Sequence, residues 1–169
     1  MKAKTLFVPL IFVLLTSALA AQDSARVILV KDANTYVLRI GKKKPFSARL
    51  LKADGPDMKQ FWGRNAYSRI YQMITGKVIQ FDSVGKDSRK RVLINAWFQG
   101  KRLDSTFISN GWAWHDTTND HEAMLDNEMN QASANHVGLW VCGANKVCPP
   151  WLWRTYKAKD RTKYCKGCN

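Results

Sequence analysis

The sequence predicts an α+β fold that is mainly a five-stranded β barrel, and three observations lead to that class. Five short runs are rich in β-branched and aromatic residues and are separated by turn-forming residues. One segment with helical spacing lies between the third and fourth runs, and further helical segments follow the fifth. Five short strands with one helix between the third and fourth is the layout of an OB-type barrel.

The first three strands are expected to form an antiparallel meander. They cover Arg26–Val30, Thr35–Ile40 and Phe46–Lys52. A turn at residues 31–34 joins the first two strands, and the basic loop Gly41–Pro45 joins the second to the third. Such short connections suit antiparallel neighbours.

A helix is expected next, over Phe61–Ile74, because its apolar residues recur at helical spacing. Gly76 lies where a glycine commonly ends a helix. The residues expected to face the barrel are Phe61, Ala66, Ile70, Met73 and Ile74.

The fourth and fifth strands are expected at Val78–Val84 and Val92–Phe98, on either side of the polar loop Gly85–Arg91. Two helices follow, at Leu103–Ser109 and Asp120–Asn135. The inward positions expected in the second of these helices are Ala123, Met124, Met129 and Ala132.

The first 20 residues have the three parts of a secretory signal peptide. Lys2 and Lys4 precede the apolar run Leu6–Leu15, and the segment Ala18-Leu19-Ala20 fits a cleavage site. An uncleaved anchor is the alternative.

The chain is therefore expected to have three parts. They are a signal peptide at 1–20, an OB-fold domain at 21–141, and a basic tail with cysteine and tryptophan residues at 142–169. We expect a secreted or periplasmic monomer that keeps no membrane span after signal cleavage, because no later segment is long and apolar enough.

The chain is strongly basic. It carries 27 lysine and arginine residues against 13 acidic residues, a net charge of +14. Two of the lysines lie in the signal segment, so the net charge after cleavage is +12. Such an excess favours anionic partners: nucleic acid, anionic glycans or a membrane surface.

Four cysteines in an exported chain indicate two disulfides. They are Cys142, Cys148, Cys165 and Cys168. We expect the local bridges Cys142–Cys148 and Cys165–Cys168, because short loops close with little loss of entropy. Other connectivities and a zinc site are the alternatives, although only one C-x-x-C pair is present.

The tail also contains Trp151 and Trp153, and residues 154–169 hold six basic residues and one acidic residue. We expect the tryptophans to dock on the barrel, since large aromatic side chains usually contribute buried area. Stacking against single-stranded bases is the alternative.

The stretch Arg49–Asp57, RLLKADGPD, presents the carboxylates of Asp54 and Asp57 in a turn after an apolar run. A second arginine group, SRKR, occupies Ser88–Arg91. Oxygen ligands suit a hard cation, and arginines on either side suit a phosphate and its transition state. The pattern suits phosphodiester chemistry, but on local pattern alone an ordinary acidic turn with surface arginines is the favoured interpretation, since turns commonly contain Asp, Gly and Pro.

From about Val27 to Trp140 the chain resembles the staphylococcal nuclease (thermonuclease) family. The resemblance rests on segments in the same order: the Asp32–Thr35 turn, RLLKADGPD, WGRNA, SRKRVLINAWFQGK, ISNGWAW and VGLW. It implies an OB barrel with C-terminal helices and a calcium-dependent enzyme that hydrolyses phosphodiester bonds in DNA and RNA.

The resemblance also implies roles for individual residues. Arg49 and Arg91 match the family's two phosphate-clamping arginines, and Asp57 stands where the family has the glutamate assigned as general base. Asn34 and Asp54 match two calcium-binding aspartates, and Gly55 would offer its backbone carbonyl to the metal. Substrate contacts are expected from Thr35, Lys42, Lys43, Lys44, Asp87 and Arg89.

Three positions depart from the family pattern. Asn34 keeps an oxygen ligand but lacks a negative charge, which should weaken Ca²⁺ binding. Asp57 is one methylene shorter than glutamate, so its carboxylate would lie farther from the attacking water. Ala33 replaces the usual turn glycine.

We therefore expect a secreted, calcium-dependent nuclease with little sequence preference that acts on DNA or RNA, preferably single-stranded. The alternative is an OB-fold module that binds nucleic acid but is catalytically weakened or inactive.

Overall fold

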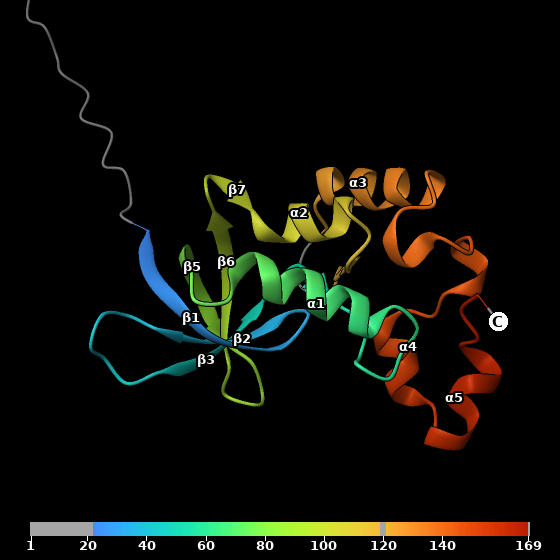
Figure 1. Cartoon of the computed structure of the whole chain (residues 1–169), viewed down its shortest axis with the longest axis horizontal. Coiled ribbons are helices and arrows are strands. Elements are labelled where there is room, and N and C mark those ends of the chain that lie inside the picture. Colours follow the sequence, from blue (N-terminus) through green and yellow to red (C-terminus); the bar gives the residue numbers. More distant parts are fainter. Residues whose placement is uncertain (1–21, 119–120, 169) are drawn as a thin grey trace, which may run out of the picture.

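The computed structural model describes residues 22–118 and 121–168, and within these ranges five strands close into a barrel (Figure 1). The strands are β1 (Asp23–Asp32), β2 (Thr35–Arg39), β3 (Phe46–Leu50), β5 (Val78–Lys86) and β6 (Val92–Phe98). They lie in the order β3-β2-β1-β5-β6, and neighbours in this order pair antiparallel. The expected OB-type barrel is confirmed, although β1 and β5 extend beyond their expected ends.

A parallel pairing of β3 with β6 closes the barrel and brings two arginine segments together. Arg49 lies opposite Leu93 in this pairing, and Arg91 immediately precedes β6. The antiparallel pairing of β2 with β3 places Thr35 opposite Arg49. Residues far apart in the sequence therefore meet at one end of the barrel.

Helix α1 (Gly63–Ile74) packs one face against the barrel, as its apolar spacing predicts. It begins two residues later than expected because Trp62 has a φ of 64°, a left-handed conformation that an α-helix does not contain. Gly76, with a φ of +73°, follows the end of the helix as expected. Ala66, Ile70 and Ile74 are buried and Met73 packs partly buried against the core, as expected. The expected inward position of Phe61 is wrong: it precedes the helix, and its ring lies against Gly167 of the tail.

Two further helices, α2 (Leu103–Ser109) and α3 (Ala123–Ala134), pack on each other beside the barrel (Figure 1). The short strand β7 (Lys101–Arg102) extends the sheet next to β6 and leads into α2. Strands β4 (Ala53–Asp54) and β8 (Trp114–His115) pair antiparallel. This second pairing fixes the start of the acidic turn against the segment that connects the two helices.

Two of the inward positions expected in α3 are wrong. Ala123 and Met124 are exposed, and Leu125 is fully buried instead. The inner face of the helix consists of Leu125, Met129 and Ala132, which recur at helical spacing. A helix face is only about 100° wide, so the two residues just before Leu125 point away from the core.

The tail forms two short helices, α4 (Pro150–Thr155) and α5 (Ala158–Tyr164), beyond one end of the barrel (Figure 1). Two 3₁₀ turns, η1 (Gly138–Trp140) and η2 (Ala144–Lys146), precede them. The expected docking of both tryptophans on the barrel is wrong. Trp153 is buried in a cluster within the tail, whereas Trp151 is 48% exposed.

The expected local disulfides are also wrong. The bridges are nested, Cys142–Cys168 outside and Cys148–Cys165 inside, with Cα–Cα distances of 5.2 and 5.1 Å. Because α4 and α5 return the chain on itself, the last two cysteines reach the first two. The tail is thereby closed into two covalent loops.

Two expectations lie outside the described residues: the signal peptide at 1–20 and the start of the third helix at Asp120. Among the helices that the structure does describe, none has the length and apolar character needed to cross a membrane.

Candidate active site

Asp54 lies at the centre of the site, at the end of β4, with its side chain 3% exposed. Arg49 Nη2 contacts its Oδ1 at 3.0 Å, and Asn34 Nδ2 donates to the same oxygen at 3.1 Å. The second oxygen, Oδ2, accepts a hydrogen bond from Arg154 Nη2. Two guanidinium groups and one amide therefore donate hydrogen bonds to this buried carboxylate. A buried charge is stable only when it is paired and hydrogen-bonded in this way.

Arg91 is oriented by Asp87 and Thr35, two of the residues that are expected to contact the substrate. Its Nε donates to Asp87 Oδ2 at 2.7 Å, and its Nη1 donates to Thr35 Oγ1 at 3.1 Å. Partial burial acts to raise the pKa of the Asp87 carboxyl, but the hydrogen bonds from Arg91 outweigh it and hold that pKa below its ordinary value. Asp87 thus stays ionised and fixes the guanidinium in place.

Arg49 is shared between two carboxylates. Besides Asp54, its Nη2 lies 3.6 Å from Oδ2 of Asp116, a residue just after β8. No local pattern marks Asp116 as a site residue, because an aspartate in a polar segment is common. The structure brings it to the site through the pairing of β4 with β8.

Asn34 faces Asp54 with its nitrogen. Its Nδ2 donates to Asp54 Oδ1 and, at 2.9 Å, to the backbone carbonyl of Ala53. Its backbone N–H donates to Asp32 Oδ1 at 3.0 Å, which holds the turn. To act as an oxygen ligand, the side-chain amide would have to turn over.

Gly55 lies against Ala33 in the neighbouring turn. A Cβ added to Gly55 would lie 2.1 Å from Ala33 Cβ, far inside van der Waals contact. Ala33 is itself only 1% exposed. The alanine at position 33 therefore requires the glycine at position 55, so the two small residues form a matched pair.

Asp57 is the more exposed of the two carboxylates, with 42% of its side chain accessible. Its Oδ2 is nonetheless buried and finds no hydrogen-bond donor among the described residues. Partial burial raises the pKa of the Asp57 carboxyl; Arg154 acts to lower it, and the nearby Asp54 and Asp32 raise it further. A carboxylate with a raised pKa is a stronger base near neutral pH.

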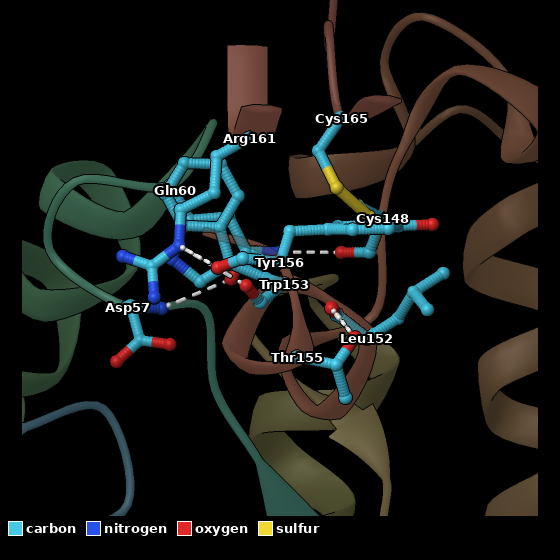
Figure 2. The surroundings of a disulfide bond; sticks show 9 residues. All are labelled: Asp57, Gln60, Cys148, Leu152, Trp153, Thr155, Tyr156, Arg161 and Cys165. Carbon is cyan, nitrogen blue, oxygen red and sulfur yellow. Dashed lines mark hydrogen bonds between the residues drawn. A yellow bond between two sulfur atoms is a disulfide. The ribbon is translucent and has the colours of Figure 1, made fainter. Parts of the chain in front are cut away.

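The turn that carries Asp57 is held from two sides. The backbone N–H of Asp57 donates to Gln60 Oε1 at 3.2 Å, and Gln60 Nε2 donates to the carbonyl of Cys148 in the tail (Figure 2). A Cβ on Gly63 would lie 1.9 Å from the Asp57 carbonyl oxygen, so only glycine lets α1 begin this close to the turn. Gln60 thus connects the acidic turn to the disulfide-closed tail.

Arg154 is a second residue of the site that no local sequence pattern marks. It lies on α4, 100 residues beyond its partner Asp54, and its Nη1 is 3.7 Å from Asp57 Oδ2. In the sequence it is one of six basic residues in the segment 154–169, and nothing local distinguishes it. A hollow of about 340 Å³ opens beside it, and its lining includes Asp32, Asp57 and Trp153.

The expected substrate-binding lysines are not brought to this site. Lys42, Lys43 and Lys44 are exposed in the β2–β3 loop, at the opposite end of the hairpin from Thr35 and Arg49. The five residues of β2 separate the two ends by about 16 Å. Their contribution would therefore be long-range attraction rather than direct contact at the carboxylates. Arg89 is exposed in the loop between β5 and β6.

The residues present fit a hard cation. One oxygen of Asp54 and one of Asp57 face the same guanidinium, that of Arg154, through different nitrogen atoms. The Asn34 side-chain oxygen, once the amide is turned over, and the Gly55 carbonyl implied by the family resemblance would add the oxygen ligands that calcium prefers. Within residues 22–118 and 121–168, no three histidine, cysteine, aspartate or glutamate side chains could hold a metal ion together. Any metal would therefore depend on amide and carbonyl oxygen as well.

Comparison with known proteins identifies relatives of this barrel. The family described as staphylococcal nuclease homologue matches residues 44–142. An uncharacterized endonuclease of Escherichia coli is 28% identical over 153 residues, covering 89% of this chain and 98% of that protein. An uncharacterized endonuclease of Haemophilus influenzae is 24% identical, covering 86% and 80% of the two chains. The staphylococcal-like nuclease CAN1 of Arabidopsis thaliana is 30% identical over 114 residues, covering 68% of this chain but 35% of the plant protein.

Proposed function

Because the chain belongs to the staphylococcal nuclease family, we propose that it is a nuclease that hydrolyses DNA or RNA with little sequence preference and uses calcium. The observation that supports this most is that the carboxylates of Asp54 and Asp57 lie at the same end of the barrel as Arg49 and Arg91. The N-terminal signal pattern and the two disulfides support export to an oxidising compartment. In this proposal the protein acts as a monomer and cleaves single-stranded nucleic acid in preference to duplex.

In this proposal Asp57 receives the proton of the attacking water. Its carboxylate borders the hollow beside the site, and its raised pKa suits a general base. Asp54, with oxygen from Asn34 and Gly55, would hold calcium, which when bound polarises a phosphate oxygen. Asp57 acts from the rim of the site, where water has access.

The two arginines bind the phosphate and stabilise the charge that grows on it. Arg91 is already oriented by Asp87 and Thr35, so it reorganises little when a phosphate arrives. Arg49 is held by Asp54 and exchanges part of that contact for the substrate. Both guanidiniums can donate two hydrogen bonds to one phosphate.

A second candidate function is nucleic-acid binding without efficient cleavage. It is favoured by the Asn34 amide, which donates to Asp54 where a metal would need oxygen, and by the occupation of both Asp54 oxygens. The shorter Asp57 side chain would act in the same direction. The basic character of the chain serves either function.

Cleavage of single-stranded DNA and of RNA by the purified protein, with calcium and with EDTA, separates the two candidates. A nuclease cleaves with calcium and not with EDTA. Arg91→Ala should reduce the rate roughly a hundredfold or more, because it removes a donor to the developing charge, while binding falls only modestly. Arg39→Ala, an exposed arginine at the far end of β2, is the matched control and should leave the rate unchanged. Binding without any cleavage would leave only the second candidate.

A further inference from the structure

One guanidinium faces both carboxylates of the site. Arg154 Nη2 donates to Oδ2 of Asp54, and Arg154 Nη1 lies 3.7 Å from Oδ2 of Asp57. The Asp57 oxygen is buried and has no hydrogen-bond donor in the described part of the chain. Arg154 is therefore a cation that already contacts the expected calcium ligand Asp54 and faces the expected base Asp57.

Contacts within the tail hold the backbone of Arg154 in this position. α4 lies inside the loop closed by Cys148–Cys165, and Trp153, next to Arg154, is 5% exposed. Arg161 lies 5.1 Å from the Trp153 ring centre and donates to the Trp153 carbonyl at 3.2 Å (Figure 2). The backbone that carries Arg154 is thus anchored on both covalent and packing grounds.

The same tail is tied directly to the acidic turn. Gln60 Nε2 donates to the Cys148 carbonyl, and Gln60 Oε1 accepts from the backbone N–H of Asp57 (Figure 2). Arg154 and Asp57 are therefore positioned by one connected set of contacts. Helix α4, which carries Arg154, lies beyond residues 44–142, the part of the chain that matches the family.

We propose that Arg154 is a built-in counter-cation that calcium must displace, so that the tail sets the calcium affinity of the site. The inference rests on the calcium site of the proposed function. A guanidinium and a calcium ion cannot both contact the Asp54 carboxylate beside Asp57, because their charges repel at short range in a partly desolvated site. Without calcium, Arg154 neutralises Asp54 and Asp57; with calcium, its side chain has to leave the carboxylates, while the anchored backbone of α4 stays in place.

Calorimetric titration of the oxidised protein with calcium chloride tests this directly. Arg154→Gln removes the competing charge, so the calcium dissociation constant should fall at least tenfold. Lys159→Gln is the matched control, since it makes the same charge change at an exposed position of the same tail, and its dissociation constant should stay within twofold of the parent. Equal or weaker calcium binding by Arg154→Gln, or no calcium binding by either protein, would overturn the proposal.

A second measurement uses the unchanged protein and does not depend on the variant folding. Hydrogen exchange of the Arg154 guanidinium N–H groups, followed by NMR, should become faster when calcium saturates the site, because their contact with the carboxylates is lost. Unchanged or slower exchange of these side-chain groups contradicts displacement.

Cleavage assays keep this inference separate from the proposed function. Tighter calcium binding by Arg154→Gln without cleavage by any variant supports the inference and rejects the nuclease. Calcium-dependent cleavage with unaltered calcium affinity in Arg154→Gln supports the nuclease and rejects the inference about Arg154. If Arg154→Gln instead weakens binding of a short oligonucleotide and leaves calcium binding unchanged, Arg154 is a phosphate ligand and the inference is wrong.

Discussion

The turns around the site contain two small residues whose sizes depend on each other. Ala33 stands where the family usually has glycine, and its methyl group fills the space that a Cβ at position 55 would need. Ala33 and Gly55 flank two expected oxygen ligands, Asn34 and Asp54. Their fit therefore affects both the stability of the barrel end and the spacing of the ligands.

We predict that Gly55→Ala lowers the free energy of unfolding by about 1–3 kcal/mol, the usual cost of overpacking a buried contact. In an Ala33→Gly background the same change should cost much less, because the nearest atom becomes the residue 33 Cα at 3.3 Å. Chemical denaturation of the four proteins of this double-mutant cycle measures the coupling. An equal cost of Gly55→Ala in both backgrounds would show that the contact is not its cause.

At the scale of elements, an ion-pair network connects the barrel to the helical layer. Arg102, at the start of α2, contacts Glu122 Oε1 at 2.5 Å and Asp104 Oδ2 at 2.7 Å. Lys52, just before β4, donates to Glu122 Oε2 at 2.8 Å. Glu122 precedes α3, so one carboxylate connects three segments. The hydrogen bonds from Arg102, and then from Lys52, lower the pKa of Glu122 to about 2.

This lowered pKa predicts how stability depends on pH. The folded pKa lies below the ordinary value of 4.5, so Glu122 stabilises the fold above about pH 4.5 and loses this effect as pH falls toward 2. Glu122→Gln should therefore lower the free energy of unfolding near pH 6 by on the order of 1–3 kcal/mol, and the difference from the parent should shrink on acidification.

Urea denaturation between neutral and acid pH measures that difference. Asp82→Asn, which makes the same charge change at an exposed position on β5, is the matched control and should show almost no pH-dependent difference. A constant cost of Glu122→Gln at every pH would mean that its contribution is packing rather than charge.

Across the whole molecule, positive charge lies at both ends of the barrel. The lysine loop at residues 42–44 is at the end of the β2–β3 hairpin away from the site, and the basic tail is beside the site. A long strand of nucleic acid can contact both, whereas two or three nucleotides at the site cannot reach the loop. Length should therefore alter how strongly binding depends on salt.

We predict that binding of a long single strand without calcium weakens about a hundredfold between 50 and 200 mM salt, as expected when about five phosphates are contacted. Changing Lys42, Lys43 and Lys44 together to glutamine should reduce the slope of log affinity against log salt for the long strand. The same change should leave a trinucleotide unaffected. Fluorescence anisotropy gives both slopes, and a salt-independent affinity for the long strand would exclude the electrostatic account.

The sequence by itself determined the order and identity of the barrel elements. Strands are encoded by local β-branched runs and turn residues, and α1 by its apolar spacing, so their main bodies were predicted from neighbouring residues alone. The stretch Arg49–Asp57 and the arginine group ending at Arg91 were found in the same way. Their juxtaposition follows once β3 pairs with β6.

Only the tertiary structure decided the disulfide pairing, the inner face of α3 and the role of Arg154. Four cysteines permit three pairings, and the choice depends on how α4 and α5 return the chain, which no local pattern encodes. The contact of Arg154 with Asp54 spans 100 residues and is made by one of many basic side chains in the tail. Local propensity fixes elements, but which charges meet across the molecule depends on the packing of those elements together.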